Sequence, residues 1–331
     1  MSPFAAELIY TRRPDAYASY MKESGSARVF VSRRDGKPIG TCAEIVRDVY
    51  IGGEPCKAAY ICGLKRHSEY NGHIGFTPGF IESLYAEDAK LHYCSVIADN
   101  DSVINTFGRL KRIISAEPVT RYTTYILNTK VRIKHGEGSL EFRQASACDL
   151  EGIIEFLNTE GKKHDLFPCV SDIGDFFGLR VEDFYLLTEN GEIQAIGALW
   201  DQSEYKQYVV KRYGGIYRLA KQLSPLLSAL GYIRLPKENL PLCFPTLSFL
   251  LCKDNSEDYF CEFFNQIMQK AQETYGMLII GLPSGHFAEK HIKSLRSISF
   301  DTLIYSISFP RRGEGTNIKQ LNNASFECAL L

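Results

Sequence analysis

Apolar residues alternate with polar ones in several short stretches of this chain, and glycine-containing turns separate these stretches. Such alternation predicts strands with one buried face. An Asp-Gly or Asn-Gly pair between two of them predicts a tight hairpin, because both turn positions need positive φ. Two hairpins are predicted in this way, with strands at 27–32 and 38–46 and at 183–188 and 193–201.

The pattern around each hairpin occurs twice, which indicates an internal duplication. A helical segment precedes each hairpin, at 13–23 and at 149–158, and a strand, a turn, a helix and another strand follow it. The second half inserts a further predicted helix at 207–230. Its next helix, at 257–273, has an apolar face at near-ideal spacing, made of Phe260, Phe263, Phe264, Ile267, Met268 and Ala271.

One turn in the first half has the features of an anion site. The apolar strand KAAYICGL at 57–64 runs into the basic, glycine-containing turn KRHSEYNGHIG. A helix opens after this turn, and the strand LHYCSVIA at 91–98 follows. Unpaired backbone N–H groups and the helix dipole both favour an anion at such a helix start. The sequence therefore predicts a phosphorylated ligand here.

The length of 331 residues exceeds what one hydrophobic core usually supports, so two domains are expected. The polar, glycine-containing segment KHGEGS at 134–139 is the predicted linker. We therefore expect an N-terminal domain at 1–135, a C-terminal domain at 140–310 and a tail at 311–331.

Charge and composition exclude several classes of protein. A formal net charge of -1 gives no electrostatic reason to expect a nucleic-acid partner. The ten cysteines lack CxxC pairs, and His286 and His291 lie five residues apart, so reduced thiols and no metal site are expected. Neither a signal-peptide pattern nor a membrane-length apolar stretch is present, so a cytoplasmic protein without a membrane partner is expected.

The order of the elements resembles the GCN5-related N-acetyltransferase superfamily. There, the turn after the fourth strand wraps the pyrophosphate of acetyl-CoA, and the pantetheine arm lies between the fourth and fifth strands. The segments YICGLKRHSEYNGHIG (60–75) and VIADNDSVINTFGR (96–109) carry the resemblance in the first half, and GALWDQSEYKQYVVKRYGGIYR (197–218) carries it in the second. Over residues 5–310 the chain is similar to bacterial proteins with two such domains in tandem.

The resemblance implies an α+β fold of two tandem acyl-CoA N-acyltransferase domains, each a mostly antiparallel twisted sheet flanked by helices. It also implies acetyl-CoA as co-substrate. The usual loop has Arg or Gln before its small residues, and here Asn71, or Tyr70 in the neighbouring register, stands in that place. The residues implied to bind acetyl-CoA are Leu64, Lys65, Arg66, Asn71, Gly72, His73, Ile74, Gly75, Phe76, Asn100 and Phe107.

Acidic residues distinguish the two halves at their corresponding turns. Asp254, Glu257 and Asp258 surround the turn of the second half, where three carboxylates would repel a pyrophosphate. Between Tyr70 and Ile81 the first half has no acidic residue. We therefore assign the CoA site to the first half. The second half is expected to be a structural partner or one wall of the acceptor pocket.

Direct acetylation of an amine needs a base, backbone N–H groups that polarise the thioester carbonyl, and an acid for the leaving thiolate. The polarising donor is expected around 62–64 on the fourth strand. The candidate bases are Glu44, Glu69 and Asp99, although exposed carboxylates are the norm for these residue types. Glu44 is favoured, because the third strand commonly faces the acceptor in the superfamily.

The superfamily's usual acid is a Tyr in the helix after the fifth strand, and Phe107 occupies that place. Tyr122 or Tyr125 could act instead only if folding brings one of them close. Two functions are open: an acetyltransferase for a small-molecule or protein amine, or a non-catalytic module that binds acetyl-CoA. Transfer from aminoacyl-tRNA is disfavoured by the near-neutral charge. A homodimer is left open.

Overall fold

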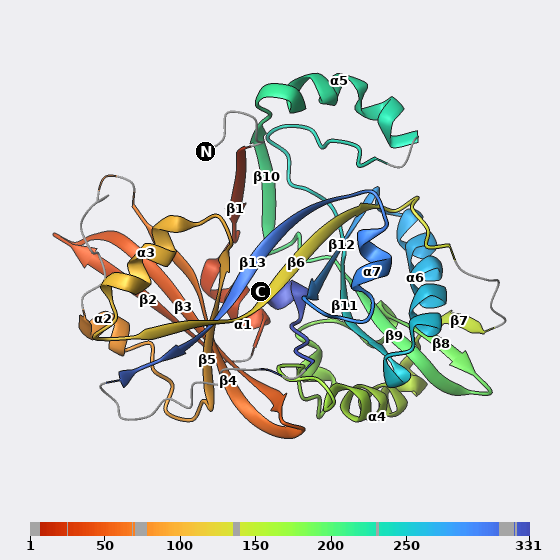
Figure 1. Ribbon diagram of the computed structural model, residues 1–331, viewed down its shortest axis with the longest axis horizontal. Helices are drawn as coiled ribbons and strands as arrows, with labels where there is room; N and C mark the ends of the chain where they lie inside the picture. The colour runs from red at the N-terminus through yellow and green to blue at the C-terminus, as the bar shows by residue number, and fades with distance from the viewer. Residues whose placement is uncertain are drawn as a thin grey trace.

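A continuous eleven-stranded sheet forms the centre of the described part of the chain (Figure 1). The computed structural model describes residues 7–24, 26–67, 69, 78–134, 140–229, 232–310, 321 and 323–331. The elements of the first half are β1 (Glu7–Thr11), α1 (Ala16–Lys22), β2 (Ala27–Arg34), β3 (Lys37–Ile51), β4 (Glu54–Arg66), α2 (Pro78–Glu82), β5 (Leu91–Ile97), α3 (Asp101–Arg109) and β6 (Ser115–Asn128).

The second half has a matching series of strands and helices. Its elements are β7 (Glu141–Gln144), α4 (Leu150–Gly161), β8 (Phe184–Glu189), β9 (Glu192–Trp200), β10 (Gln207–Arg212), α5 (Gly215–Ala229), β11 (Thr246–Cys252), α6 (Glu257–Gln272), β12 (Met277–Pro283), α7 (Glu289–Lys293) and β13 (Ser297–Ser308). Short 3₁₀ helices lie at Ala147–Asp149, Ile173–Phe176, Val181–Asp183, Lys253–Asn255 and Cys328–Leu330.

The order of strands in the sheet is β2-β3-β4-β5-β13-β6-β12-β11-β9-β8-β7. We call β2–β5 with α1–α3 the N-terminal lobe, and β7–β9, β11 and β12 with α4, α6 and α7 the C-terminal lobe. They lie on the left and the right of Figure 1. Among the described strands only the pairs β4–β5 and β11–β12 are parallel. The expected α+β fold with a mostly antiparallel sheet is confirmed.

Strands β6 and β13 cross between the two lobes. β6 follows α3 of the N-terminal lobe but pairs with β12, whereas β13 follows α7 of the C-terminal lobe but pairs with β5. The two crossing strands also pair with each other. Each lobe therefore completes its sheet with a strand from the other half of the sequence. The domain boundaries stay a prediction.

Both predicted hairpins form because their turns have the required backbone. Asp35 and Gly36 have φ of 50° and 76°, and Asn190 and Gly191 have φ of 52° and 83°. These left-handed conformations match the twist of the flanking strands. β2 with β3 and β8 with β9 are the resulting antiparallel pairs.

The predicted helix at 207–230 is wrong in its first part. Residues Gln207–Arg212 form strand β10, which pairs with β1 in a separate two-stranded sheet. This segment contains Val209 and Val210, whose branched side chains favour strands, and the glycines at 214 and 215 separate it from α5. The predicted face of α6 is confirmed, since all six of its apolar residues are buried.

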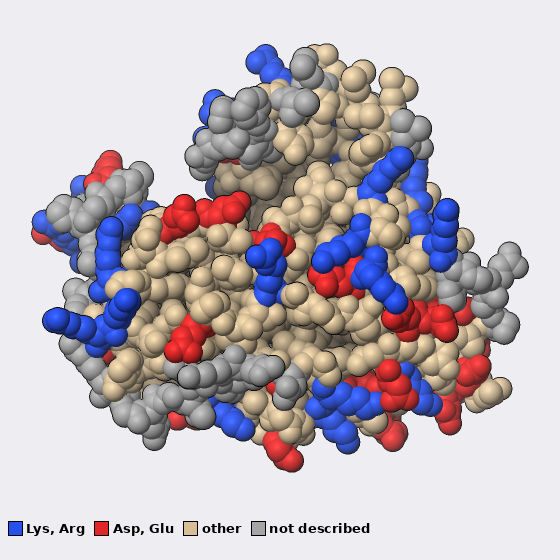
Figure 2. Space-filling view, viewed as in Figure 1, with Lys and Arg blue, Asp and Glu red and all other residues tan. Residues whose placement is uncertain are grey.

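Residues 323–331 pass between the lobes, and the end of the chain lies near the middle of Figure 1. Ala324 and Phe326 are buried against the N-terminal lobe, whereas Ala329 and Leu330 are buried against the C-terminal lobe. No helix among the described residues is long and apolar enough to cross a membrane. On the face shown in Figure 2, acidic and basic side chains are interspersed.

Candidate functional site

Two parallel strands separate at the centre of the N-terminal lobe. β4 pairs with β5 from Ala58 to Ile61, opposite Leu91 to Cys94. β4 then continues to Arg66 while it stays paired with β3 on its other side. The two strands therefore splay apart toward their carboxyl ends. This is the opening that a pantetheine arm would need.

A bulge lies in β4 just beyond the last pair. The register of β3 with β4 shifts next to Cys62, and Gly63 has a φ of 62°. Glycine adopts this left-handed conformation without the strain that a side chain causes. The Tyr20 hydroxyl lies so close to Gly63 that an added Cβ would clash with it. A hydroxyl group therefore stands beside the strand segment expected to polarise a thioester.

Tyr20 belongs to α1 and is buried. Its ring stacks against the Arg12 guanidinium, with 4.1 Å between Arg12 Cζ and the ring centroid. Burial raises the pKa of Tyr20 to about 12, although the positive charge of Arg12 acts in the opposite direction. The hydroxyl therefore keeps its proton at neutral pH and can act as a donor.

A buried group of charges fixes Arg12 and joins the two lobes. Arg12 Nη2 lies 3.0 Å from Glu23 Oε2, and Lys206 Nζ lies 3.4 Å from Glu23 Oε1. Arg47 Nε donates to the Glu23 carbonyl oxygen at 3.0 Å. Burial acts to raise the pKa of Glu23, but Lys206 and Arg12 outweigh it and lower this pKa. Glu23 is therefore an ionised structural carboxylate, unsuited to act as a base.

The C-terminal lobe repeats the splay and the bulge. β11 pairs in parallel with β12 only where Thr246 lies opposite Ile279, and its register with β9 shifts beyond Ser248. Phe249, in this bulge, has a φ of 51°. The Phe249 amide donates to Glu327 Oε1 at 2.8 Å. In this lobe a carboxylate of the protein already accepts from the bulge amide.

The segment that carries Glu327 covers the splay of the C-terminal lobe. Ala329 and Leu330 belong to the same buried cluster as Phe249 and Leu251. Burial raises the pKa of Glu327 from 4.5 to about 7, against the effect of the hydrogen bond from the Phe249 amide. Glu327 Oε2 has no hydrogen-bond partner among the described residues. An acyl thioester in this lobe would have to displace Glu327.

The turn after β11 is acidic and is balanced by cations of the protein itself. Lys163 Nζ lies 2.8 Å from Asp254 Oδ1 and 2.7 Å from Glu160 Oε2. Glu257 pairs with Lys290 and with His291. A pyrophosphate at this turn would meet these carboxylates. The acidic residues of this turn therefore lie together in the structure and pair with cations of the protein.

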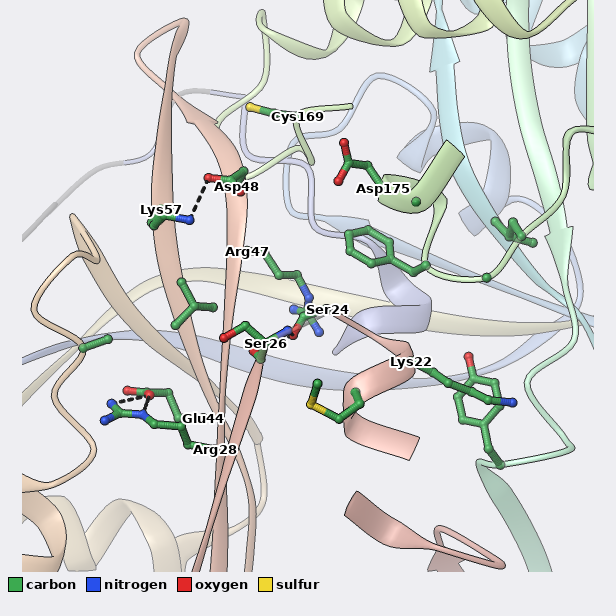
Figure 3. A pocket seen from close by; sticks show the side chains of 18 of the residues that line it. Lys22, Ser24, Ser26, Arg28, Glu44, Arg47, Asp48, Lys57, Cys169 and Asp175 are labelled. Atoms are coloured by element: carbon green, nitrogen blue, oxygen red, sulfur yellow. Dashed lines mark hydrogen bonds and ion pairs between the residues drawn. The ribbon is translucent and has the colours of Figure 1, made fainter. Parts of the chain in front are cut away.

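A cavity of about 1270 Å³ lies at the junction of the lobes, beside the end of α1 (Figure 3). Its lining includes five carboxylates of the first half: Glu44, Asp48, Glu82, Glu87 and Asp88. Four more come from the second half: Asp175, Asp183, Asp201 and Glu204. The cationic side chains among the described lining residues are Lys22, Arg28, Arg47 and Lys57.

Glu44, the favoured candidate base, lies in the wall of this cavity. It is 1% exposed and pairs with Arg28, as Figure 3 shows. Glu44 Oε1 has no hydrogen-bond partner among the described residues. Burial raises the pKa of Glu44, and the hydrogen bond from Arg28 opposes this rise. The carboxylate of Glu44 therefore already has Arg28 as a partner, and its second oxygen is closed to solvent.

The other two candidate bases lie elsewhere. Glu69 is exposed, near His67, and Asp99 is exposed at the end of β5. Asn100 caps α3, where its side chain accepts from the Val103 amide at 3.3 Å. The structure does not bring Glu69 or Asp99 to the cavity, and their catalytic roles stay predictions.

Among the residues expected to bind acetyl-CoA, Leu64, Lys65 and Arg66 form the exposed end of β4. Lys65 Nζ lies 5.2 Å from the Tyr10 ring centroid. Phe107 packs against Tyr305, with 5.2 Å between ring centroids. The remaining residues of the expected loop lie outside the described residues: Asn71, Gly72, His73, Ile74, Gly75 and Phe76.

The two tyrosines considered as substitute acids do not approach the β4 bulge. Tyr122 and Tyr125 lie on β6, and β13 separates β6 from β5. The Tyr122 hydroxyl donates to the Phe326 carbonyl oxygen at 3.1 Å. Tyr20, which does lie beside the bulge, is absent from the sequence-based candidates because α1 is remote from β4 in sequence. The sequence places Tyr20 on the predicted helix at 13–23 but does not indicate that this helix lies beside β4.

No family model and no curated protein matches this sequence. Solved structures do match its fold. A GCN5-related N-acetyltransferase from Anabaena variabilis has a TM-score of 0.50 at 10% identity, over 90% of this chain and 72% of that one. N-myristoyltransferase from Saccharomyces cerevisiae with bound myristoyl-CoA has a TM-score of 0.51 at 9% identity, over 82% of this chain and 64% of that one.

The chain therefore has the fold of the GCN5-related N-acetyltransferase superfamily, which confirms the resemblance at the level of fold. The same fold is present in N-myristoyltransferase from Saccharomyces cerevisiae. Identities near a tenth of the aligned residues carry no information on the substrate.

Proposed function

We propose that this protein transfers an acyl group from acetyl-CoA to an amine, and that its N-terminal lobe holds the acetyl-CoA. The observation that carries this proposal is the difference between the two bulges. Gly63 forms the β4 bulge beside a protonated hydroxyl, whereas the Phe249 amide in the β11 bulge already donates to Glu327. The shared fold with solved N-acyltransferases supports the class of reaction.

In this proposal the splay of β4 and β5 receives the pantetheine arm, and the acyl carbonyl lies beside Gly63. The pyrophosphate lies at the turn after Arg66, where basic residues and the start of α2 favour an anion. That turn is assigned from its sequence. The second lobe contributes the opposite wall of the acceptor cavity.

The reaction follows from this placement. The amine nitrogen attacks the carbonyl carbon, and a backbone N–H near Gly63 stabilises the oxygen as it becomes negative. The C–S bond then breaks, and the sulfur keeps the electron pair. Tyr20 donates its hydroxyl proton to this thiolate and regains, through water, the proton that the amine gives up. Positioning of the two substrates supplies much of the remaining rate.

A second candidate function is a non-catalytic module that binds acyl-CoA. Phe107 favours it, because this residue stands where the superfamily's usual acid is expected and has no proton to donate. The Asn at position 71, in place of Arg or Gln, also favours it. In the first candidate, Tyr20 from α1 replaces the missing acid.

The experiment is calorimetric titration with acetyl-CoA and with desulfo-CoA, followed by a thiol-release assay over a panel of amines. Binding of one acetyl-CoA per chain, and release of CoA thiol with at least one amine, are the expected results. Binding without release on any amine would favour the module. Absence of binding at millimolar concentration would overturn both candidates.

A further inference from the structure

The two-stranded sheet of β1 and β10, together with α5, lies apart from the two lobes. This sheet is separate from the eleven-stranded one, and α5 follows β10 at the top of Figure 1. The segment after α5 returns to β10, where the Asn239 amide donates to the Val210 carbonyl oxygen at 2.8 Å. We call residues 7–11 and 207–240 the projecting unit.

The charge of the projecting unit differs from that of the whole chain. The unit contains six Lys or Arg residues and two acidic residues, Glu7 and Glu238, so its net charge is +4 in a chain of net charge -1. The two carboxylates pair with three of these cations. The other three cations are exposed: Arg218, Arg234 and Lys237. The unit therefore presents positive charge to solvent.

Apolar side chains are also exposed in the projecting unit. Single exposed apolar residues are ordinary on protein surfaces, but a group of them marks a site of interaction. Among the described residues, fourteen large apolar side chains are exposed, and seven of them belong to this unit: Leu8, Ile9, Tyr217, Leu223, Leu226, Tyr232 and Leu240. The unit therefore combines exposed cations with exposed apolar residues.

Helix α5 turns leucines toward solvent and a polar residue toward the protein. Ser224 is buried, and its Oγ accepts from the Leu235 amide at 2.6 Å. Leu223 and Leu226 are three residues apart, so they share a face of the helix, and they are 55% and 71% exposed. A surface helix of a globular protein normally buries its apolar face. This face of α5 is therefore available to an apolar partner.

An anionic lipid surface matches both features of the unit. Its acyl chains can receive leucines, while its phosphate groups attract Lys and Arg. Arg218 and Leu226 lie in one i, i+4 row of α5, so a cation stands beside the exposed leucines. A nucleic acid offers phosphates but no apolar layer for leucines. With 15 residues, α5 is shorter than the roughly 20 that span a bilayer, and it suits a helix that lies in the surface.

We propose that the projecting unit binds an anionic lipid surface. The leucines of α5 insert among the acyl chains, and its exposed cations lie at the phosphate groups. The expectation of no membrane partner rested on the lack of a spanning stretch, and binding in the surface needs no such stretch. The inference does not depend on the proposed acyl transfer, because the exposed residues that carry it lie outside the acyl-CoA site.

The test is flotation of the whole protein with lipid vesicles. We expect binding to vesicles of equimolar phosphatidylcholine and phosphatidylglycerol, at least about tenfold weaker binding to phosphatidylcholine alone, and loss of binding as NaCl is added. No binding to the mixed vesicles, or equal binding to both kinds, would overturn the inference. Sedimentation without lipid checks the other occupant: a dimer that Leu223→Ser with Leu226→Ser dissociates, without any vesicle binding, would assign the surface to a second copy and also overturn it.

One pair of variants tests the apolar contact. Leu223→Ser combined with Leu226→Ser should weaken binding to the mixed vesicles about a hundredfold, because two leucines lose their burial in lipid. Val31→Ser combined with Ile173→Ser removes exposed apolar side chains from the two lobes and should have little effect. Equal losses in the two double variants would contradict insertion of α5.

A second pair of variants tests the charge. Arg218→Gln combined with Lys237→Gln should weaken binding about thirtyfold, since each cation near an anionic surface contributes about fivefold. Lys253→Gln combined with Lys270→Gln removes the same charge from the C-terminal lobe and should change binding little. Equal losses here would show that net charge alone, and not the projecting unit, attracts the vesicles, and would overturn the inference.

Discussion

The two lobes have the same bulge in corresponding strands but differ in what meets it. In the N-terminal lobe, Gly63 in β4 faces the Tyr20 hydroxyl. In the C-terminal lobe, the Phe249 amide in β11 donates to a carboxylate from residue 327. The backbone has a similar shape in both places. A splay whose amide donor already meets another segment of the chain has no free donor at that point for a ligand.

The lobes also depend on each other. β6 and β13 complete the sheet of the opposite lobe, and Lys206 of the second half forms a buried ion pair with Glu23 of the first. The second half therefore supports the structure around the proposed site of the first half, although its own splay is covered. The following experiments test this asymmetry.

The largest expected effect is that of Lys206→Met. Lys206 Nζ also donates to the Ala329 carbonyl oxygen at 2.7 Å, so its loss removes the buried cation beside Glu23 Oε1 and a buried donor to this carbonyl, although Arg12 still pairs with Glu23 Oε2. We expect a loss of about 3–5 kcal/mol in the free energy of unfolding, measured with urea. Lys253→Met removes an exposed pair with Glu192 and should cost less than about 1 kcal/mol. Similar costs for both variants would show that the buried pair does not join the lobes.

Glu327→Gln should change the pH dependence of stability. The pKa of Glu327 is about 7 in the folded protein and 4.5 as its ordinary value. Its stabilising contribution is therefore fully present below pH 4.5 and is lost as the pH rises through 7, on the order of 3 kcal/mol in all. Gln cannot ionise, so the variant should gain stability relative to the natural protein across this interval. If the unfolding free energies of the variant and the natural protein change in parallel between pH 5 and pH 8, the burial of Glu327 is contradicted.

Tyr20→Phe should reduce turnover without changing the affinity for acetyl-CoA. Loss of a general acid costs about a hundredfold in rate, or about 2.7 kcal/mol. In the natural protein, ionisation of Tyr20 should lower the rate of acyl transfer at high pH. The variant should not show this decline. Tyr217→Phe, at an exposed position on α5, is the control. A turnover equal to that of the natural protein would exclude Tyr20 as the proton donor.

Gly63→Ala tests the shape of the β4 bulge. Its Cβ would meet the Tyr20 hydroxyl in a left-handed backbone, and we expect a loss of about 2 kcal/mol in stability together with reduced turnover. Gly191→Ala is the matched control, because Gly191 also has positive φ but no heavy atom lies within 4 Å of its added Cβ. It should cost about 1 kcal/mol from backbone strain alone. If Gly191→Ala lowers the free energy of unfolding as much as Gly63→Ala does, the contact with Tyr20 does not determine the cost at Gly63.

The smallest expected effect is that of Asp254→Asn combined with Glu257→Gln. These changes remove two carboxylates from the turn after β11, where acidity alone would exclude a pyrophosphate. Because Glu327 still occupies the Phe249 amide, the number of acetyl-CoA molecules bound per chain should stay at one. A second binding event in calorimetry would show that the turn, and not the covering segment, closes this lobe.

Local features of this protein could be predicted from its sequence, and long-range pairings could not. The turns at Asp35-Gly36 and Asn190-Gly191 form as expected, because the need for positive φ is set within two residues. The apolar spacing of α6 gives its buried face for the same reason. The exchange of β6 and β13 has no local signature, since it depends on which strand edges meet in space.

In the candidate site, too, local features could be predicted from the sequence and long-range contacts could not. Glu44 could be proposed from its strand, and it lies in the cavity wall. Tyr20 reaches Gly63 from a separate helix, and Glu327 lies in the segment that the sequence assigns only to a tail. The segment QYVVKR at 207–212 continues a helical pattern in the sequence but forms strand β10. Its conformation depends on pairing with β1, which lies about two hundred residues away.

The most direct test of the asymmetry is hydrogen–deuterium exchange with and without acetyl-CoA. We predict that acetyl-CoA slows exchange in β4 and β5, around 58–66 and 91–97, and leaves β11 and β12 unchanged. Protection at 246–252 and 277–283 in place of the first pair would contradict the assignment of the acyl-CoA site to the N-terminal lobe.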